Sequence, residues 1–158
     1  MAGRMETINK KIVSFVIAFI AIFVLIFACY HFWTAVNVDN IKSVQIREQT
    51  IKVELALNEE AQERGLSDRK ELKENEGMLF VFSEEGKHDF WMKDMNFPID
   101  MVWMDESKII IYIEDNTKPE SYPDSYGPAA LSRYVLEVNA GVSEKNNWKV
   151  GDEVKFLY

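Results

Sequence analysis

The segment from Phe90 to Asp100 (FWMKDMNFPID) is the most unusual stretch of the sequence. It places large aromatic rings, a thioether, a cation and two carboxylates within eleven residues. In an extended strand, Trp91 and Lys93 project to one face, while Phe90 and Asp94 project to the other. Either face can form an aromatic platform flanked by charge, as in pockets for sugars and small polar ligands. The apolar content also fits, and favours, a buried core in which Asp94 only caps a turn.

Asp100 and Glu137 each interrupt an otherwise apolar stretch. A carboxylate in such a place either faces solvent by alternation or is buried, and a buried one needs a partner. Arg64, Arg69 and Arg133 are available for a structural Arg–carboxylate bridge, which is the usual arrangement of a buried pair. A third alternative is that the two carboxylates converge on a pocket with separated pKa values and carry out general acid–base chemistry.

The remaining polar residues predict neither a catalytic centre nor a metal site. His88, in a polar turn, is typical of a solvated surface residue. It is the only histidine after residue 33, the other being His31, and one histidine cannot assemble a His and Cys zinc site in the domain. The acidic residues Glu114, Asp115, Glu120 and Asp124 lack the spacing of a calcium loop. The sequence contains no phosphate-binding loop, no Gly-x-Ser-x-Gly elbow and no dinucleotide fingerprint. We therefore expect no metal and no cofactor.

The elements that must position these residues are mostly short strands. Residues 51–57 alternate apolar and polar side chains, and Asn58 can cap a short helix that ends at Gly65. Further strands are expected at residues 78–82, 90–92, 99–104, 109–113, 134–138 and 154–156, with a hairpin turn at 105–107 and a loop at 115–130. The pattern predicts a mainly β fold, α+β at most: a small compact barrel or sandwich with one short helix.

The charge of the chain argues against a nucleic-acid partner. From Asn37 onward there are 15 Lys and Arg against 25 Asp and Glu, a net charge of about −10. Such a surface repels phosphates and lacks the basic patch that duplex binding requires. The only cysteine, Cys29, precedes this part, which is long enough to bury a core without disulfides.

Residues 12–33 form a run without any Lys, Arg, Asp or Glu, and it ends in aromatic residues suited to the headgroup level. A helix of this length spans a hydrocarbon core of about 30 Å. More basic residues stand close before the run than after it, which favours the N-terminus inside and the domain outside the cytoplasm. The sequence thus predicts a single-pass membrane protein with an extracytoplasmic domain.

Two alternatives to an uncleaved anchor remain open, and both keep the domain outside the cytoplasm. A basic start before an apolar run also describes a signal peptide, although Trp33 occupies the critical position before a cleavage site. Residues 26–29 resemble a lipobox, in which Cys29 becomes a lipidated first residue, although Phe27 is bulky for its position. The expected organisation is a cytoplasmic tail at residues 1–11, a transmembrane helix at 12–33, a juxtamembrane linker at 34–47 and a β-rich domain at 48–158.

Five ordered sequence blocks resemble the domain-of-unknown-function family 192. These are Arg64–Arg69 (RGLSDR), Gly77–Phe82 (GMLFVF), Phe90–Asp100, Tyr134–Gly141 (YVLEVNAG) and Gly151–Asp152. The resemblance covers residues 48–157 and implies a small β-rich fold, often behind an N-terminal signal or anchor. It implies no activity, catalytic residue or cofactor. The family's usual Asn after Trp-Met-Lys is Asp94 in this sequence.

The sequence therefore favours a non-catalytic module that binds a small polar ligand or an envelope component. One alternative is a hydrolase or lyase that acts on an envelope polymer through Asp94, Asp100 or Glu137, and another is a structural or assembly module. The residues expected to bind the ligand are Arg69, Phe90, Trp91, Lys93, Asp94, Asp100 and Glu137.

Overall fold

The computed structural model describes residues 14–28 and 38–158, which fall into two compact units divided after Val38. Residues 14–28 form a helix with exposed side chains. Within the described ranges, no helix combines the length and the apolar character needed to cross a membrane. The expected tail at residues 1–11, both ends of the expected segment 12–33, Cys29 and residues 34–37 of the expected linker lie outside the described residues.

The second unit consists of strands joined by short helical segments. In chain order these are η1 (Val38–Asn40), β1 (Ser43–Ile46), β2 (Gln49–Ala56), α2 (Glu59–Arg64), β3 (Glu76–Gly86), β4 (Phe90–Trp91), β5 (Ile99–Met104), β6 (Ile110–Thr117), η2 (Pro119–Ser121), β7 (Ser125–Tyr126), β8 (Ser132–Asn139), α3 (Val142–Lys145) and β9 (Val154–Leu157). The mainly β prediction is therefore confirmed.

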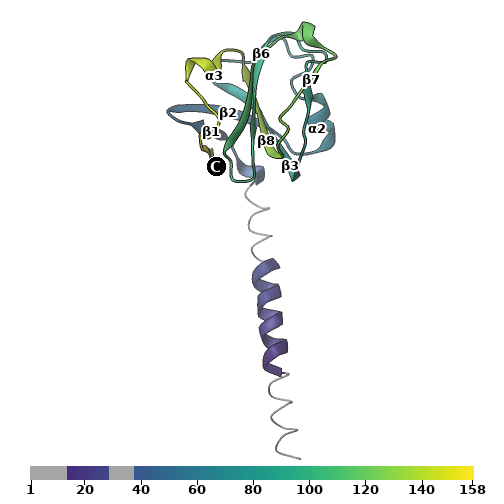
Figure 1. Ribbon diagram of the computed structural model, residues 1–158, viewed down its shortest axis with the longest axis vertical. Helices are drawn as coiled ribbons and strands as arrows, with labels where there is room; N and C mark the ends of the chain where they lie inside the picture. Colours follow the sequence, from purple (N-terminus) through teal and green to yellow (C-terminus); the bar gives the residue numbers. More distant parts are fainter. Residues whose placement is uncertain (1–13, 29–37) are drawn as a thin grey trace, which may run out of the picture. The chain divides into compact units, whose positions relative to one another are not determined.

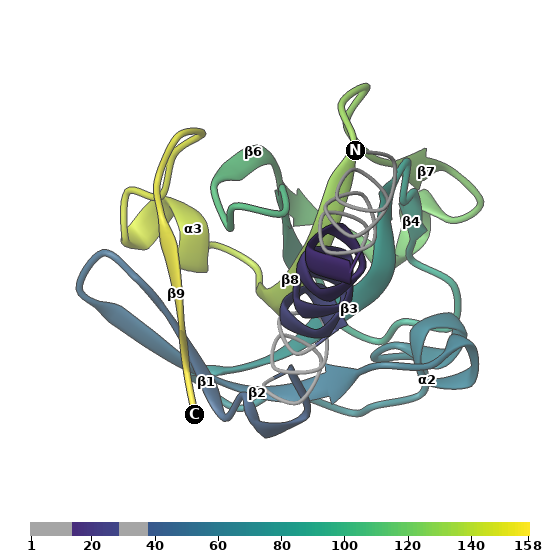
Figure 2. The same ribbon diagram turned by 90° about the horizontal axis from the view of Figure 1, so that it is seen from below.

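Seven strands form one curled sheet in the order β6-β5-β8-β3-β2-β1-β9, and β4 pairs with β7 in a separate ribbon. Among the described strands, only β2 and β3 run parallel, because α2 carries the chain back between them. The two edge strands meet at one end, where Ile109 bridges Glu153 and the Ile110 N–H donates to the Asp152 carbonyl at 2.9 Å. The sheet is thus a half-barrel, with α2, β4 and β7 toward one side and α3 and β9 toward the other (Figures 1 and 2).

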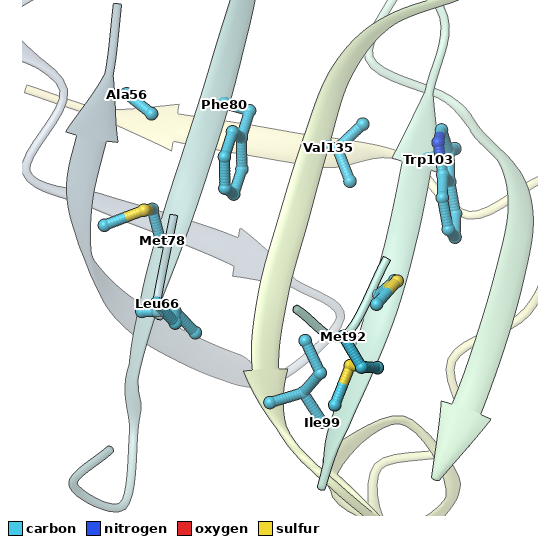
Figure 3. Close-up of a cluster of buried hydrophobic side chains, with 9 residues drawn as sticks. Ala56, Leu66, Met78, Phe80, Met92, Ile99, Trp103 and Val135 are labelled. Carbon is cyan, nitrogen blue, oxygen red and sulfur yellow. The ribbon is translucent and has the colours of Figure 1, made fainter. Parts of the chain in front are cut away.

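Side chains pack against both faces of the sheet, which explains why all six residues of β5 are buried. On one face, Phe80, Val135 and Trp103 follow one another across β3, β8 and β5, as Figure 3 shows. Leu66 and Met92 cover this row from the segments outside the sheet. The same face carries the pocket described below, so its floor is a strand layer and its walls are the covering segments.

The local signals for the turns and the first helix are confirmed. The Asn58 side chain accepts a hydrogen bond from the Ala61 N–H at 2.9 Å and caps α2. Gly65 ends this helix with φ of +50°, a conformation that favours glycine. The hairpin between β5 and β6 also forms where the sequence predicts it.

Several elements depart from the sequence pattern. Residues 43–46, within the expected linker, form strand β1, whose Val44 and Ile46 are fully buried between β2 and β9. A second short helix, α3, follows β8, and strand structure continues into the expected loop at 115–130. These segments are too short to show a periodic pattern in the sequence. Contacts with distant segments, rather than local sequence, hold them in place.

Candidate ligand-binding site

A pocket of about 320 Å³ opens where α2, β3 and the segment leading into β4 come together. Its lining combines the end of α2 and the turn after it with aromatic side chains of β3 and β4 and a single side chain of β8. The volume lies at the lower end of the range of small-molecule pockets. Of the seven residues predicted to bind ligand, three line it: Phe90, Trp91 and Glu137.

Glu137 is the β8 side chain at the base of this pocket. The sheet register sets it between Met78 of β3 and Met101 of β5, so its neighbours on both sides are apolar. It is 4% exposed, and burial raises the pKa of its carboxyl to about 8, although the positive charge of Arg69 acts in the opposite direction. Its Oε2 atom is buried without a hydrogen-bond partner among the described residues.

Gly65 keeps the space beside Glu137 open. A Cβ atom at this position would lie 3.3 Å from Cζ of Phe80 and 3.8 Å from Oε2 of Glu137. The positive φ of Gly65 also disfavours any residue with a side chain. One glycine thus serves both the turn after α2 and access to the carboxyl.

His88 is a pocket residue that the sequence interpretation missed. Its ring stacks on Phe82 at 3.5 Å with an interplanar angle of 7°, and its Nε2 is buried without a partner within the described part of the chain. Burial lowers the His88 pKa, against opposing effects of the Glu84 backbone and the Asp89 charge, and this favours neutral imidazole. The expected solvated role is therefore wrong. The only sequence signal for a role of His88 in the pocket is its position just before the aromatic block.

Aromatic rings make the apolar part of the pocket wall. Phe90 packs edge to face against Phe80 at 4.7 Å and against Phe82 at 6.4 Å between ring centroids. It also contacts Trp103, whose indole N–H donates to the His88 carbonyl at 2.8 Å. Trp91 stands at the rim and remains 52% exposed. The sequence predicts that the aromatic block forms either a buried core or a ligand pocket, and different residues of it do each. The buried Met92 belongs to the core, while Phe90 and Trp91 line the pocket.

Lys93 and Asp94 do not line the pocket, because β4 ends at Trp91 and the chain turns away. Both side chains are exposed. Their carbonyls anchor the turn: the Lys93 carbonyl accepts from the Ser67 hydroxyl at 2.9 Å, and the Asp94 carbonyl from the Asp68 N–H at 2.8 Å. Asp94 has φ of +55°, a conformation that Asn and Asp tolerate better than most residues.

Asp100 lies on the opposite face of the sheet from Glu137, because the two residues have opposite parity in the β5–β8 register. Its carboxylate accepts hydrogen bonds from the N–H groups of Asn116, Gly141 and Ser143 and from the Ser143 hydroxyl, at 2.7–3.0 Å. Backbone N–H groups and a serine hydroxyl, rather than an arginine, are thus its partners. The alternative in which Asp100 and Glu137 converge on one pocket is therefore wrong, since alternation along the strands separates them.

Arg69 also lies outside the pocket lining. Its guanidinium forms two hydrogen bonds to the Glu54 carboxylate, at 2.7 and 2.6 Å. Arg69 therefore influences Glu137 through its charge, which favours the ionised carboxyl. In the described ranges, no group of three or more His, Cys, Asp or Glu side chains is arranged to hold a metal ion.

Comparisons with known proteins agree with this fold. The family model DUF192, described as Uncharacterized ACR, COG1430, matches residues 42–156. A crystal structure of a protein of unknown function from Novosphingobium aromaticivorans DSM 12444 is 28% identical, with a TM-score of 0.69 over 73% of this chain and 84% of that one. A structure from Sinorhizobium meliloti 1021, described as a "putative transcription regulator", is 29% identical, with a TM-score of 0.67 over 72% of this chain and 90% of that one. No curated protein matches the chain.

Proposed function

The chain belongs to the DUF192 family, and we propose that its β-rich domain binds a small neutral ligand in the pocket beside Glu137 and His88. The observation that carries the proposal is a pair of buried polar atoms. Within the described residues, four buried side-chain N or O atoms have no hydrogen-bond partner, and two of them belong to these pocket residues. A buried polar group without a partner costs about 1–3 kcal/mol, so a ligand that hydrogen-bonds to these two side chains gains affinity from them.

The charges around the pocket favour a neutral ligand over an ion. With a pKa of about 8, the Glu137 carboxyl is mainly protonated at pH 7, and the lowered pKa of His88 keeps its ring neutral. Charges of both signs stand in the lining, which includes Glu59, Glu63 and Asp89 together with Arg64 and Lys87. A ligand with a net charge would therefore lose its hydration without gaining an opposite charge at the base of the pocket.

Nuclear magnetic resonance of the full chain with small probes tests this proposal. At pH 6.5 we expect neutral cyclohexanol and phenol to shift the Trp91 indole signal, with Kd on the order of 1 mM. Benzoate and benzylammonium should bind more weakly, because the base of the pocket offers no opposite charge. Glu137→Met, which keeps the length of the side chain but removes the polar atoms, should weaken the neutral probes by about tenfold.

The matched control for this experiment is Tyr158→Ala, which removes an exposed aromatic residue outside the pocket lining. It should leave probe binding intact. An unchanged Trp91 signal with every probe up to saturating concentration would refute the pocket, as would equal affinities of the parent protein and Glu137→Met.

We also propose that the N-terminal segment tethers the domain to a membrane and that the domain lies outside the cytoplasm. Residues 14–28 support a tether, because this helix has no charged residue and exposes large apolar side chains such as Phe15 and Phe19. Nucleic acid is not among the partners we propose, since an acidic domain repels phosphates. The ligand would then be a small molecule or a component of the cell envelope.

Cysteine labelling in cells tests the tether and its orientation. In a Cys29→Ala background, Glu120→Cys places one thiol on an exposed part of the β-rich domain. We expect a membrane-impermeant maleimide to label this thiol in cells stripped of their outer envelope layers, and the protein to sediment with membranes. Labelling only after lysis would place the domain inside the cytoplasm and contradict the proposal.

A further inference from the structure

We propose that the ligand is a single neutral sugar ring, which stacks on Trp91 and bonds through its hydroxyls to Glu137 and His88. This inference rests on the proposed function, because it names the chemistry of the compound that enters the same pocket. It depends on three features: an exposed aromatic face at the rim, two unpartnered polar atoms deeper in, and the limited size of the cavity.

The rim of the pocket offers a flat apolar surface. Trp91 lines the pocket yet is 52% exposed, although a tryptophan normally buries most of its large ring. Phe90, its neighbour, is held in place by edge-to-face contacts with Phe80 and Phe82, so the wall behind the rim is preformed. The C–H face of a pyranose ring matches such a surface, and stacking would cover the exposed indole.

The interior of the pocket offers hydrogen bonds that hydroxyl groups can complete. Nε2 of His88 has no hydrogen-bond partner among the described residues, and in a neutral imidazole it can accept or donate a hydrogen bond, depending on the tautomer. The protonated Glu137 carboxyl can both donate and accept. A hydroxyl group also donates and accepts, so neighbouring hydroxyls on one ring meet both requirements. Aliphatic or simple aromatic alcohols supply only one such group.

The size of the pocket selects one ring rather than a polymer. Its volume of about 320 Å³ is near the minimum for small-molecule sites, so it accommodates one ring rather than several. The free sugar and a terminal sugar unit of an envelope glycan share this chemistry. Methyl glycosides distinguish the two, because they lack the free anomeric hydroxyl of a monosaccharide.

Saturation-transfer and chemical-shift experiments with defined sugars test the inference. The full chain is placed in nanodiscs free of glycolipid and of sugar-headed detergent, and titrated with glucose, galactose, mannose, N-acetylglucosamine and their methyl glycosides. We expect at least one sugar to bind and to displace cyclohexanol. Trp91→Ala should weaken that sugar by about tenfold, and Glu137→Met by a similar factor, while Tyr158→Ala keeps the parent affinity. Glu137→Gln should weaken binding less than Glu137→Met does, because an amide also donates and accepts.

The possible outcomes separate this inference from the proposed function. Binding of cyclohexanol or phenol without binding of any sugar overturns the sugar assignment and leaves the pocket as a site for another neutral ligand. Absence of binding by every probe overturns both. Sugar binding that Trp91→Ala does not weaken contradicts the stacking arrangement and with it the inference.

Discussion

Replacing Glu137 with glutamine is expected to stabilise the protein at neutral and alkaline pH while changing little at pH 4. Burial raises the pKa of this carboxyl from 4.5 to about 8, so the folded state holds a proton that the unfolded state loses between these two values. The unfolded chain therefore binds fewer protons, and stability falls as pH rises through this window. At about 1.4 kcal/mol per pH unit, the advantage of Glu137→Gln reaches roughly 3 kcal/mol at pH 7 and roughly 5 kcal/mol at pH 9.

Urea denaturation at a series of pH values from 4 to 9, followed by circular dichroism, measures this difference. The other titrating groups are common to both proteins, so their contributions cancel in the comparison. Glu120→Gln, at an exposed glutamate, is the matched control and should follow the parent protein at every pH. If the curves of Glu137→Gln and the parent run parallel across the range, Glu137 is not the buried neutral acid described above.

Replacing Asp100 with alanine is expected to destabilise the fold by about 4 kcal/mol, which is exceptional for a single substitution. Asp100 accepts four hydrogen bonds, and one of its donors, the Asn116 N–H, lies where the β5–β6 register shifts. Two other donors, at Gly141 and Ser143, belong to the start of α3. The substitution leaves these donors without a partner on a buried face, and each unsatisfied group costs about 1–3 kcal/mol.

Thermal and urea unfolding of Asp100→Ala and Asp100→Asn measure this loss. The asparagine variant should also be destabilised, because its NH₂ group is only a donor and cannot accept hydrogen bonds from the N–H groups that it faces. Asp124→Asn changes the same side chain at an exposed position and should stay within about 0.5 kcal/mol of the parent protein. A loss below 1 kcal/mol for Asp100→Ala would contradict the structural role assigned to this carboxylate.

Local signals in the sequence determined the framework of the domain. The alternation in β2 and the Asn58 cap followed by Gly65 specify structure through backbone conformation and side-chain direction within a few residues. Such signals act within a few residues, so the mainly β fold and α2 could be predicted without knowledge of the tertiary contacts, and both are confirmed. The blocks that resemble the family also lie in the domain, and the matched family model covers them.

Which carboxylate reaches the pocket depended on tertiary structure alone. Asp100 and Glu137 look equivalent in sequence, since each interrupts an apolar strand. They differ because the register of β5 against β8 turns them to opposite faces, and because backbone donors meet only Asp100. The periodicity of a strand predicts that its side chains alternate between the two faces of the sheet. It does not predict which face a distant segment of the chain covers.

His88 shows the same limit from the other direction. Its neighbours in sequence are polar, so the local pattern predicts exposure. Phe82 and Trp103 bury part of it through a ring stack and a hydrogen bond to its carbonyl. The sequence by itself determined seven of the nine strands, the capped helix and the aromatic block. Only the packing of separate segments over one face of the sheet decided that Glu137 and His88 share a pocket, because burial without a partner is a property of the folded surroundings and not of any residue.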